Sequence, residues 1–304
     1  MDHGGQPRHL ARDRSGTGRV IGRVPHATRQ DINRALLAAQ KGFDIWRHTP
    51  PYDRAKVLKR TAELIRERAG LIEWLMTTEQ GKAAHEARYE VASAADYFEW
   101  FAEQGKRAYG RIVPSRRPEV QQLVKRQPIG PVAAFTPWNF PAITPARKLA
   151  AALAAGCSVI IKPGEECPAT ALAIGRALED AGLSKGVVQI AFGVPADISS
   201  QLINSPVIRK VTFTGSVPVG RLLAAQAARG VKPITLELGG HGPVLVFNDA
   251  DLDAAATLGA TNRFRGTGQI CISSTRFLIQ RESLDTFTAV SYTHLRAHET
   301  REDL

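Results

Sequence analysis

PVAAFTPWNFPAITPARKLAAALAAGCSVIIKPGEE, residues 131–166, is the stretch that decides the fold. It starts with a short apolar strand, PVAAFT, continues into a helix that begins near Pro145, and returns to a second apolar strand, SVII. The same alternation follows with the strands VVQIA, KVTFT and PITLEL, and with helices expected to begin near Pro168, Ala196 and Ser216. Strand, helix and strand repeated in this way predict a doubly wound, Rossmann-like α/β domain with a parallel sheet, which binds ligands at the carboxyl ends of its strands.

An amphipathic helical segment precedes this sheet, from Gln30 to about Arg107, and its apolar residues recur at three-to-four spacing. This pattern predicts a packed helical layer. The segments RIVPS and VQQLVKR then flank the turn-like RRPE, which predicts a two-stranded hairpin within residues 110–128 that serves assembly of a homo-oligomer. The opening sixteen residues carry no pattern of regular structure.

A second α/β unit begins after Gly240 with HGPVLVFNDADLDAAATLGATNRF and the strand STRFLIQ, but too few residues follow to finish it. The stretch SYTHLRAHETREDL is expected not to continue the amphipathic helix begun by RESLDTFTAV, and its composition favours a non-native tail. The predicted organisation is a cofactor-binding domain over 17–109 and 129–239, a bridging hairpin over 110–128, the beginning of a truncated catalytic domain over 240–290, and the tail over 291–304.

The composition is that of a globular protein, since 43% of the 304 residues are hydrophobic and 23% are charged. Three cysteines without a CxxC pair exclude a disulfide framework and a Cys-rich zinc site, so no metal is expected. The uncharged stretch between Arg126 and Arg147 contains five prolines, which argues against a membrane helix. With no secretory signal at the start, we expect a cytoplasmic protein.

The net charge of +11 raises the alternative of a nucleic-acid-binding protein. Most of the excess lies in residues 1–130, which hold 24 Lys and Arg against 15 Asp and Glu. Charges of both signs alternate there along helical patterns, as on solvated helix faces, and no basic run is interleaved with aromatic residues. The charge therefore favours a solvated surface, and nucleic-acid binding is the weakest of the alternatives.

Conventional nucleotide motifs are incomplete in this chain. FTGSVPVG, residues 213–220, begins like a P-loop but lacks the Lys and the Ser or Thr that hold phosphate and magnesium. It does lie at a strand-to-helix turn, where free N–H groups and the helix dipole favour a pyrophosphate. The alternative is a plain turn in which Gly215 has a positive φ.

Five motifs occur together in one order: TPWNFP, IIKPGE, FTGSVPVG, LELGG and GQIC. In this order and spacing the chain resembles the aldehyde dehydrogenase superfamily over residues 17–290. RKLAAALAAGCSVIIKP and MTTEQGKAAHEA resemble its succinate-semialdehyde dehydrogenase branch in particular. The resemblance implies NAD(P)-dependent oxidation of an aldehyde to a carboxylic acid by a homo-oligomer.

The oxidation needs a nucleophile, because an aldehyde carries no tetrahedral oxyanion from which a hydride can leave; a thiolate must add to the carbonyl first. Cys271 in GTGQIC is the candidate, whereas Cys157 and Cys167 are interpreted as small buried residues. The oxyanion needs a donor, and the side-chain amide of Asn139 in its stiff loop fits, although an Asx turn is the alternative role for this residue.

The remaining thioester needs a general base to activate water. Glu237 is flanked by Leu236 and Leu238 at the end of a strand, so we expect a buried carboxylate with a raised pKa, suited to that role. The alternative is a solvated residue at a sheet edge. The resemblance assigns the same role of general base to Glu237.

For the cofactor, the resemblance implies that Lys162 contacts the adenosine ribose, after the strand SVII. A carboxylate at Glu165 accepts a hydrogen bond from a 2′-hydroxyl and repels a 2′-phosphate, which favours NAD, with NADP possible; a solvated turn is the alternative. The expected cofactor-binding residues are Thr136, Pro137, Trp138, Lys162, Glu165, Gly215, Ser216, Gly220, Leu238 and Gly239.

Arg147 and Arg265 match positions that hold the distal carboxylate of the substrate in the succinate-semialdehyde branch, and a guanidinium pair suits a carboxylate. Succinate semialdehyde is therefore the expected substrate. The alternatives are that Arg147 lies at the surface and that Arg265 fixes the GTGQIC loop. Glutarate semialdehyde, a neutral or aromatic aldehyde, and a non-catalytic truncated fragment remain alternative interpretations.

Overall fold

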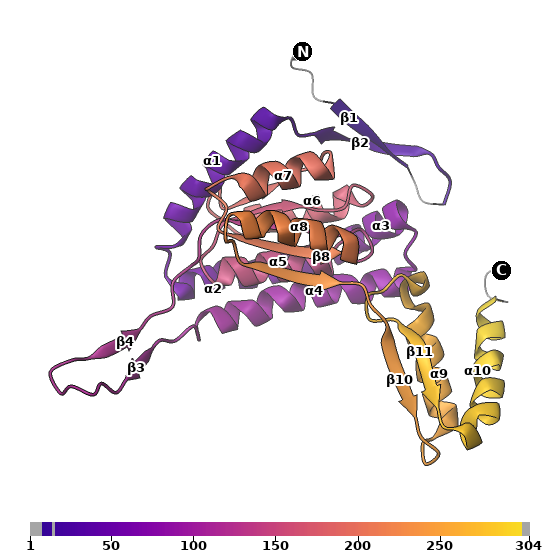
Figure 1. Ribbon diagram of the computed structural model, residues 1–304. Coiled ribbons are helices and arrows are strands. Elements are labelled where there is room, and N and C mark those ends of the chain that lie inside the picture. Colours follow the sequence, from indigo (N-terminus) through magenta and orange to yellow (C-terminus); the bar gives the residue numbers. More distant parts are fainter. Residues whose placement is uncertain (1–7, 14–15, 300–304) are drawn as a thin grey trace. The chain divides into compact units, whose positions relative to one another are not determined.

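A computed structural model describes residues 8–13 and 16–299 of the chain. The chain divides into two units, Met1–Glu237 and Leu238–Leu304. The first unit is built around a five-stranded sheet with the strand order β7-β6-β5-β8-β9 (Figure 1). Its strands are β5 (Val132–Phe135), β6 (Val159–Lys162), β7 (Val188–Ile190), β8 (Lys210–Gly215) and β9 (Ile234–Leu238).

The predicted doubly wound sheet is confirmed. β5 pairs in parallel with β6 on one side and with β8 on the other, and β6 pairs in parallel with β7. The chain therefore runs outward from β5 through β6 to β7 and then returns to the other side of β5. Phe135 is in register with Lys162 and with Phe213, so three strands end side by side. This reversal of strand order is the position where open α/β sheets bind their ligands.

Four helices connect these strands: α5 (Ile143–Ala154), α6 (Pro168–Asp180), α7 (Pro195–Asn204) and α8 (Val217–Arg229). Each begins within two residues of the position that the sequence predicts. Three of them carry Pro at one of the first two positions, where its missing N–H leaves no hydrogen bond unmade.

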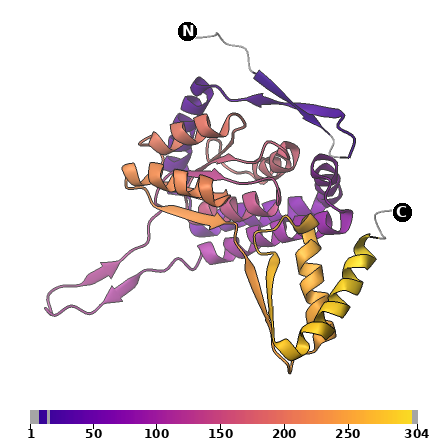
Figure 2. The ribbon, with the colours of Figure 1, turned by 45° about the vertical axis from the view of Figure 1, so that its right-hand side comes forward.

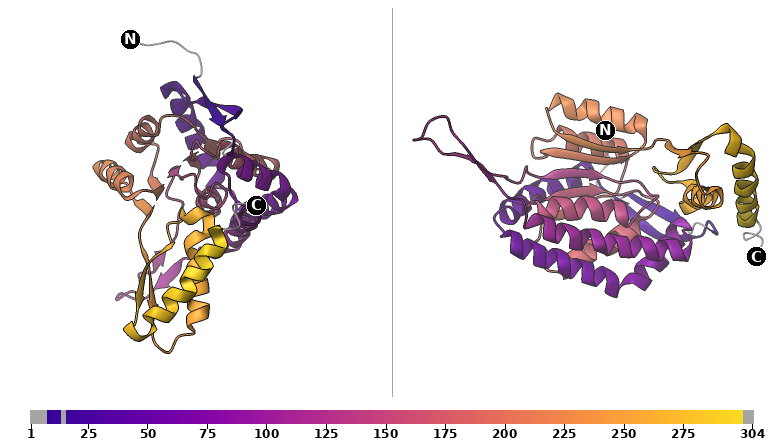
Figure 3. Two further views of the ribbon diagram at one scale, coloured as in Figure 1. Left: turned by 90° about the vertical axis from the view of Figure 1, so that its right-hand side faces the viewer. Right: turned by 90° about the horizontal axis from the view of Figure 1, so that it is seen from below.

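The predicted helical layer consists of α1 (Arg29–Trp46), α2 (Pro51–Glu67), α3 (Ala69–Gln80) and α4 (Ala84–Gly105). The helix α4 packs against both α2 and α5, as the view from below in Figure 3 shows. Phe98 and Leu149 are completely or almost completely buried in this contact, and burial of such a side chain stabilises the fold by about 2–3 kcal/mol. Arg54 donates to the main-chain oxygen of Ala154, 3.2 Å away, and so holds the end of α5.

The predicted hairpin is also present, as β3 (Arg111–Val113) and β4 (Gln122–Val124) in antiparallel pairing. It extends away from the sheet of its unit (Figure 2). Ile112 and Leu123 face each other in the register and are 80% and 57% exposed. A ribbon with exposed apolar side chains fits a role in assembly, which stays a prediction.

One further strand pair was missed at the start of the chain. β1 (Arg8–Asp13) pairs antiparallel with β2 (Val20–His26), so the expectation of no regular structure is wrong for residues 8–13. The residues of β2 are mostly exposed, with only Val24 buried. With a single buried residue, β2 does not show the alternation of buried and exposed positions that periodicity detects. Residues 1–7 and 14–15 lie outside the described part.

The second unit contains a parallel pair of strands, as expected, and two α-helices that pack against each other. Its core is small, with Val246, Ala256 and Phe287 buried together. The elements are β10 (Gly242–Val246), α9 (Leu252–Phe264), the 3-10 turns η1 (Arg265–Gly268) and η2 (Arg281–Ser283), β11 (Ser274–Ile279) and α10 (Leu284–Glu299).

The prediction that the last helix stops near residue 290 is wrong, because α10 continues through SYTHLRAHE to Glu299. This segment holds Leu, Arg, Ala and Glu and neither Gly nor Pro, so helix propagation meets no barrier. Among the described residues, no helix has the length and apolar character that a membrane span requires.

Candidate active site

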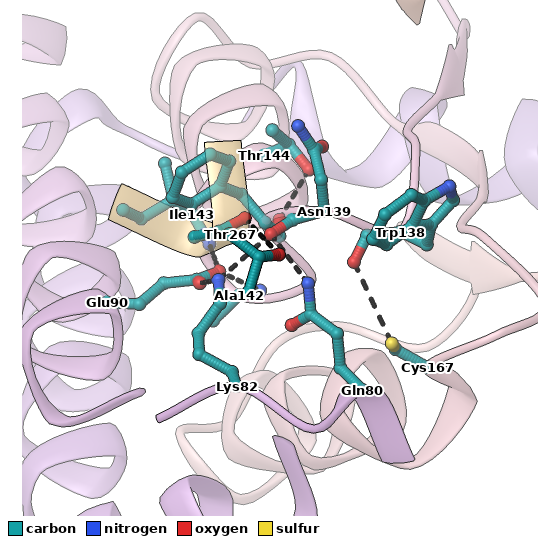
Figure 4. Close-up of polar contacts among 12 residues, drawn as sticks. Gln80, Lys82, Glu90, Trp138, Asn139, Ala142, Ile143, Thr144, Cys167 and Thr267 are labelled. Atoms are coloured by element: carbon teal, nitrogen blue, oxygen red, sulfur yellow. Dashed lines mark hydrogen bonds and ion pairs between the residues drawn. The ribbon is translucent and has the colours of Figure 1, made fainter. Parts of the chain in front are cut away.

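The loop that carries Asn139 follows β5 and is fixed at both ends. The main-chain N–H of Thr136 donates to the carbonyl of Lys162 at 3.1 Å, which ties the loop to β6. The main-chain oxygen of Asn139 accepts two side-chain hydrogen bonds, from Gln80 Nε2 and from Lys82 Nζ, both at 2.9 Å (Figure 4). Asn139 itself is half-buried. The helical layer thus holds the residue that the sequence predicts as the oxyanion donor.

A buried ion pair between Lys82 and Glu90 supports this loop. Glu90 Oε1 also accepts hydrogen bonds from the N–H groups of Ala142 at 2.8 Å and Ile143 at 3.1 Å. Burial raises the pKa of Glu90, and the ammonium of Lys82 and the two N–H groups oppose this shift. Sequence reasoning missed the pair, although QGKAAHEARYE contains a lysine and a glutamate eight residues apart.

The predicted ribose-binding residues come together after β6. Lys162 Nζ lies 2.5 Å from Glu165 Oε1, and their side chains are only 7% and 17% exposed. Lys162 also donates to the main-chain oxygen of Pro163 at 3.1 Å. A solvated turn, the alternative interpretation of KPGEE, does not describe these two residues.

The turn between β8 and α8 differs from one expectation. Gly215 does not have a positive φ; instead, a side chain on this residue is excluded because its Cβ would lie 2.4 Å from the ring of Phe213. Ser216 is the N-cap residue of α8 with an extended backbone, and its side chain makes no capping hydrogen bond. Gly220 is buried in the first turns of the helix.

Two threonines beside this turn bear on whether a dinucleotide fits. The hydroxyl oxygens of Thr136 and Thr214 are buried and have no hydrogen-bond partner among the described residues. They follow Phe135 and Phe213, which are in register, so Thr136, directly after β5, is next to the strand β8 that carries Thr214. A hydroxyl both donates and accepts, and the N-terminus of α8 adds free N–H groups that favour a pyrophosphate. The residues present therefore fit NAD or NADP.

Glu237 does not lie in the buried apolar setting expected for it. β9 is the edge strand of the sheet, and Thr235 and Glu237 on its one face are both exposed, while Leu236 and Leu238 on the other face are half-buried. The flanking leucines of the sequence motif therefore point to the opposite side.

Glu237 influences the pKa of a nearby lysine, Lys148. Burial, together with the charge of Arg147, lowers the pKa of Lys148 to about 8, and the carboxylate of Glu237 opposes this shift. Lys148 Nζ donates to the hydroxyl of Thr212 at 2.8 Å. Glu237 thus lies within electrostatic reach of a lysine on α5 that sequence reasoning did not identify.

Cys271 is a free, exposed thiol in the turn between η1 and β11. The turn has an unusual backbone, because Gly266, Thr267 and Gly268 have successive positive φ values of 56°, 54° and 74°. For threonine this conformation costs about 1–3 kcal/mol, and it occurs mostly at functional sites. Cys157 and Cys167 are buried, as interpreted from the sequence, and burial raises the pKa of both thiols.

The two substrate arginines are only partly exposed. The guanidinium of Arg147 lies 5.8 Å from the ring centroid of Tyr97. Arg265 contributes to an apolar cavity of about 460 Å³ within the second unit, and its Nε is buried without a partner among the described residues. Arg263, not Arg265, holds the GTGQIC loop, because it donates to Gly268 O at 3.2 Å.

Asn139, Glu237 and Arg147 belong to the first unit, and Cys271 and Arg265 belong to the second. The convergence of these groups on one carbonyl carbon stays a prediction. Leu238 is half-buried and Gly239 is exposed, and no atom lies within 4 Å of a Cβ built on Gly239. In the described part of the chain, no group of three or more His, Cys, Asp or Glu residues is arranged to hold a metal ion.

Comparison with known proteins agrees with the resemblance noted in the sequence. The model of the aldehyde dehydrogenase family matches residues 5–302. The 4-(hydroxymethyl)benzenesulfonate dehydrogenase TsaD1 of Comamonas testosteroni is 48% identical over 271 residues, which are 89% of this chain and 57% of that protein. The glutarate-semialdehyde dehydrogenase of Pseudomonas aeruginosa is 42% identical to this chain. The match covers 89% of this chain and 56% of that protein.

Among solved structures, the succinate-semialdehyde dehydrogenase from Burkholderia pseudomallei superimposes with a TM-score of 0.93 at 41% identity. The match covers 95% of this chain and 60% of that one. The α/β architecture is therefore shared with that enzyme, and the chain spans somewhat more than half the length of the relatives it matches.

Proposed function

Since the chain belongs to the aldehyde dehydrogenase family, we propose that the protein oxidises an aldehyde to a carboxylic acid with NAD as the hydride acceptor. One observation carries the proposal: the strands β5, β6 and β8 end side by side. They bring together the loop of Asn139, the pair of Lys162 with Glu165, and the turn at Gly215. These are the oxyanion donor, the ribose contacts and the pyrophosphate turn that the motifs predict.

In this proposal the thiolate of Cys271 adds to the aldehyde carbon, and the amide of Asn139 donates to the oxyanion that forms. A donor of this kind contributes about 3 kcal/mol to the transition state. The bound nicotinamide supplies the acceptor for the hydride that leaves the same carbon. Glu237 then takes a proton from the water that attacks the thioester, which releases the acid and restores the thiolate. The exposure of Glu237 supports its access to water.

We propose that the substrate carries a distal anion and that it is succinate semialdehyde. Arg147 and Arg265 supply two guanidinium groups, and a buried Nε without a partner among the described residues makes Arg265 suited to a carboxylate. The relatives are named for a sulfonate-bearing compound and for two semialdehydes that end in a carboxylate. Glutarate semialdehyde is therefore the next candidate substrate, ahead of a neutral aldehyde.

The preference for NAD rests on Glu165. Its carboxylate is held by Lys162 at 2.5 Å beside the end of β6. A 2′-phosphate placed there would face this carboxylate, whereas a 2′-hydroxyl could donate to it. We propose that NADP is bound more weakly than NAD. Glu165→Gln is expected to narrow the difference in affinity between the two cofactors.

The proposal is tested by following NADH formation when the purified chain is mixed with NAD and succinate semialdehyde. Wild type is expected to turn over, and Cys271→Ala is expected to abolish turnover while NAD still binds, since the thiol is needed only for the chemistry. Full activity of Cys271→Ala would refute the assignment of the nucleophile. A wild-type chain that binds NAD but oxidises neither charged nor neutral aldehydes would favour the non-catalytic alternative.

We also propose that the hairpin of residues 110–128 joins copies of the chain in a cytoplasmic homo-oligomer. Its exposed apolar side chains, such as Ile112, support this role. The replacement Ile112→Asp is expected to lower the mass measured by light scattering, and an unchanged mass would contradict the proposal.

A further inference from the structure

Side chains from the helical layer hold main-chain groups within residues 139–143. Gln80 and Lys82 come from the end of α3 and the turn after it, and Glu90 comes from α4 (Figure 4). These side chains bond to main-chain groups of the segment, so they act on its position whatever side chains the segment carries.

Lys82 is the centre of this arrangement. Its side chain is 2% exposed, and its ammonium contacts Glu90, the main-chain oxygen of Asn139 and the face of Phe140, 4.3 Å from the ring centroid. Burying both charges costs desolvation, and a buried ion pair is on average no more stable than apolar residues of the same volume. Stability alone therefore gives little reason for this pair.

Glu90 links the ammonium to the start of α5. One carboxylate oxygen contacts Lys82, and the other accepts from the N–H groups of Ala142 and Ile143. These two N–H groups stand at the N-terminal end of α5, where the helix offers them no acceptor, so the carboxylate of Glu90 supplies one. The ion pair thus ties the carbonyl of Asn139 to the first turn of the next helix.

We propose that Lys82 and Glu90 are positioning residues that set the place of the Asn139 amide in the oxyanion site. The proposal rests on the proposed function, in which this amide stabilises the oxyanion. Neither residue touches the substrate. Their effect passes through the main chain of the loop, and a displacement of about 1 Å at a catalytic group can lower a rate by about 100-fold.

Three variants of the full chain separate positioning from general support of the fold. Lys82→Met removes the ammonium and leaves Glu90 buried without its charge partner. Lys82→Met with Glu90→Gln removes both charges and keeps an acceptor for the N–H groups of α5. The control, Arg54→Met, removes another buried cation that bonds to α5, at the opposite end of the helix, through the carbonyl of Ala154.

The first readout needs no activity. The chain is labelled with 15N-asparagine, and the side-chain amide resonance of Asn139 is assigned by its loss in Asn139→Asp. This resonance is expected to shift or broaden in both Lys82 variants and to stay in place in Arg54→Met. An unchanged resonance in the Lys82 variants would overturn the proposal, because the amide would keep its place without the pair.

The second readout compares stability with turnover. Urea unfolding is expected to show Lys82→Met as the least stable, with the double variant largely restored because no buried charge is left alone. The kcat of both is expected to fall about 10- to 100-fold, while the Kd for NAD changes by less than about threefold. Recovery of kcat together with stability in the double variant would overturn the proposal. If wild type oxidises no aldehyde, the proposed function fails, and the resonance alone decides whether Lys82 positions Asn139.

Discussion

The positive charge of Lys148 is expected to destabilise the folded chain. Burial and the charge of Arg147 lower its pKa from 10.5 to about 8. At about 1.4 kcal/mol for each pKa unit, this corresponds to about 3 kcal/mol of destabilisation while the lysine is protonated in both the folded and the unfolded chain.

The pH dependence has a definite sign. Below pH 8 both states are protonated and the full cost is present. Between about pH 8 and 10.5 the folded chain loses this proton while the unfolded chain keeps it, so the free energy of unfolding rises with pH. Above that window both states are neutral and the cost is gone.

The replacement Lys148→Met removes this dependence. At pH 7 the variant is expected to be about 2 kcal/mol more stable than wild type, because it also loses the hydrogen bond to Thr212, which contributes about 1 kcal/mol. The measurement is urea unfolding of both proteins at several pH values from about 7 to 10.5. Other groups that titrate in this range are common to both proteins, so the difference between the two curves isolates Lys148.

As the pH rises through the window, the stability advantage of Lys148→Met over wild type is expected to disappear. At the upper end wild type is expected to be the more stable protein, because the variant lacks the hydrogen bond to Thr212. Lys41→Met, at an exposed lysine of α1, is the control and is expected to run parallel to wild type. Parallel curves for Lys148→Met as well would refute the reasoning, because the folded chain would then not penalise the charged lysine.

Three further outcomes follow from single contacts. Glu79→Gln is expected to lower the free energy of unfolding by about 1 kcal/mol, measured in urea, because the carboxylate accepts from the first N–H groups of α6 at 2.8 and 3.2 Å. Gly215→Ala forces the ring of Phe213 to move, since the new Cβ would lie 2.4 Å from it, and is expected to weaken NAD binding in calorimetry at least tenfold, whereas Gly70→Ala, where no atom lies within 4 Å, leaves it unchanged. Arg265→Gln is expected to raise the KM for succinate semialdehyde about tenfold or more and to leave that for a neutral aldehyde of equal length within about twofold; equal changes for both would count against a carboxylate contact.

Local pattern was enough to predict the order of the elements in the first unit. Apolar runs such as VAAF and VIIK alternate with segments of helical period, and Pro168 and Pro195 stand in the first turns of their helices as fixed φ favours. The parallel sheet follows because strands joined through helices must run in the same direction. The pairing of Lys162 with Glu165 could also be anticipated, since they lie three positions apart in one tight turn.

Patterns without an apolar face gave weaker predictions. The strand β2, which pairs with β1, is mostly exposed, so nothing in its periodicity distinguished it from a loop. For Glu237 the flanking leucines predicted burial, but a strand alternates its faces, and the exposed face of an edge strand carries the glutamate.

The amino-acid sequence alone thus determined the strands, the helices and the motifs at the strand ends, because each of these depends on residues that are close in sequence. Only the tertiary structure decided that Lys82 and Glu90 hold the loop of Asn139. These residues lie 57 and 52 positions from the groups they bond. Such contacts arise from the packing of α4 against α5, and packing depends on how whole helices fit together rather than on any local pattern.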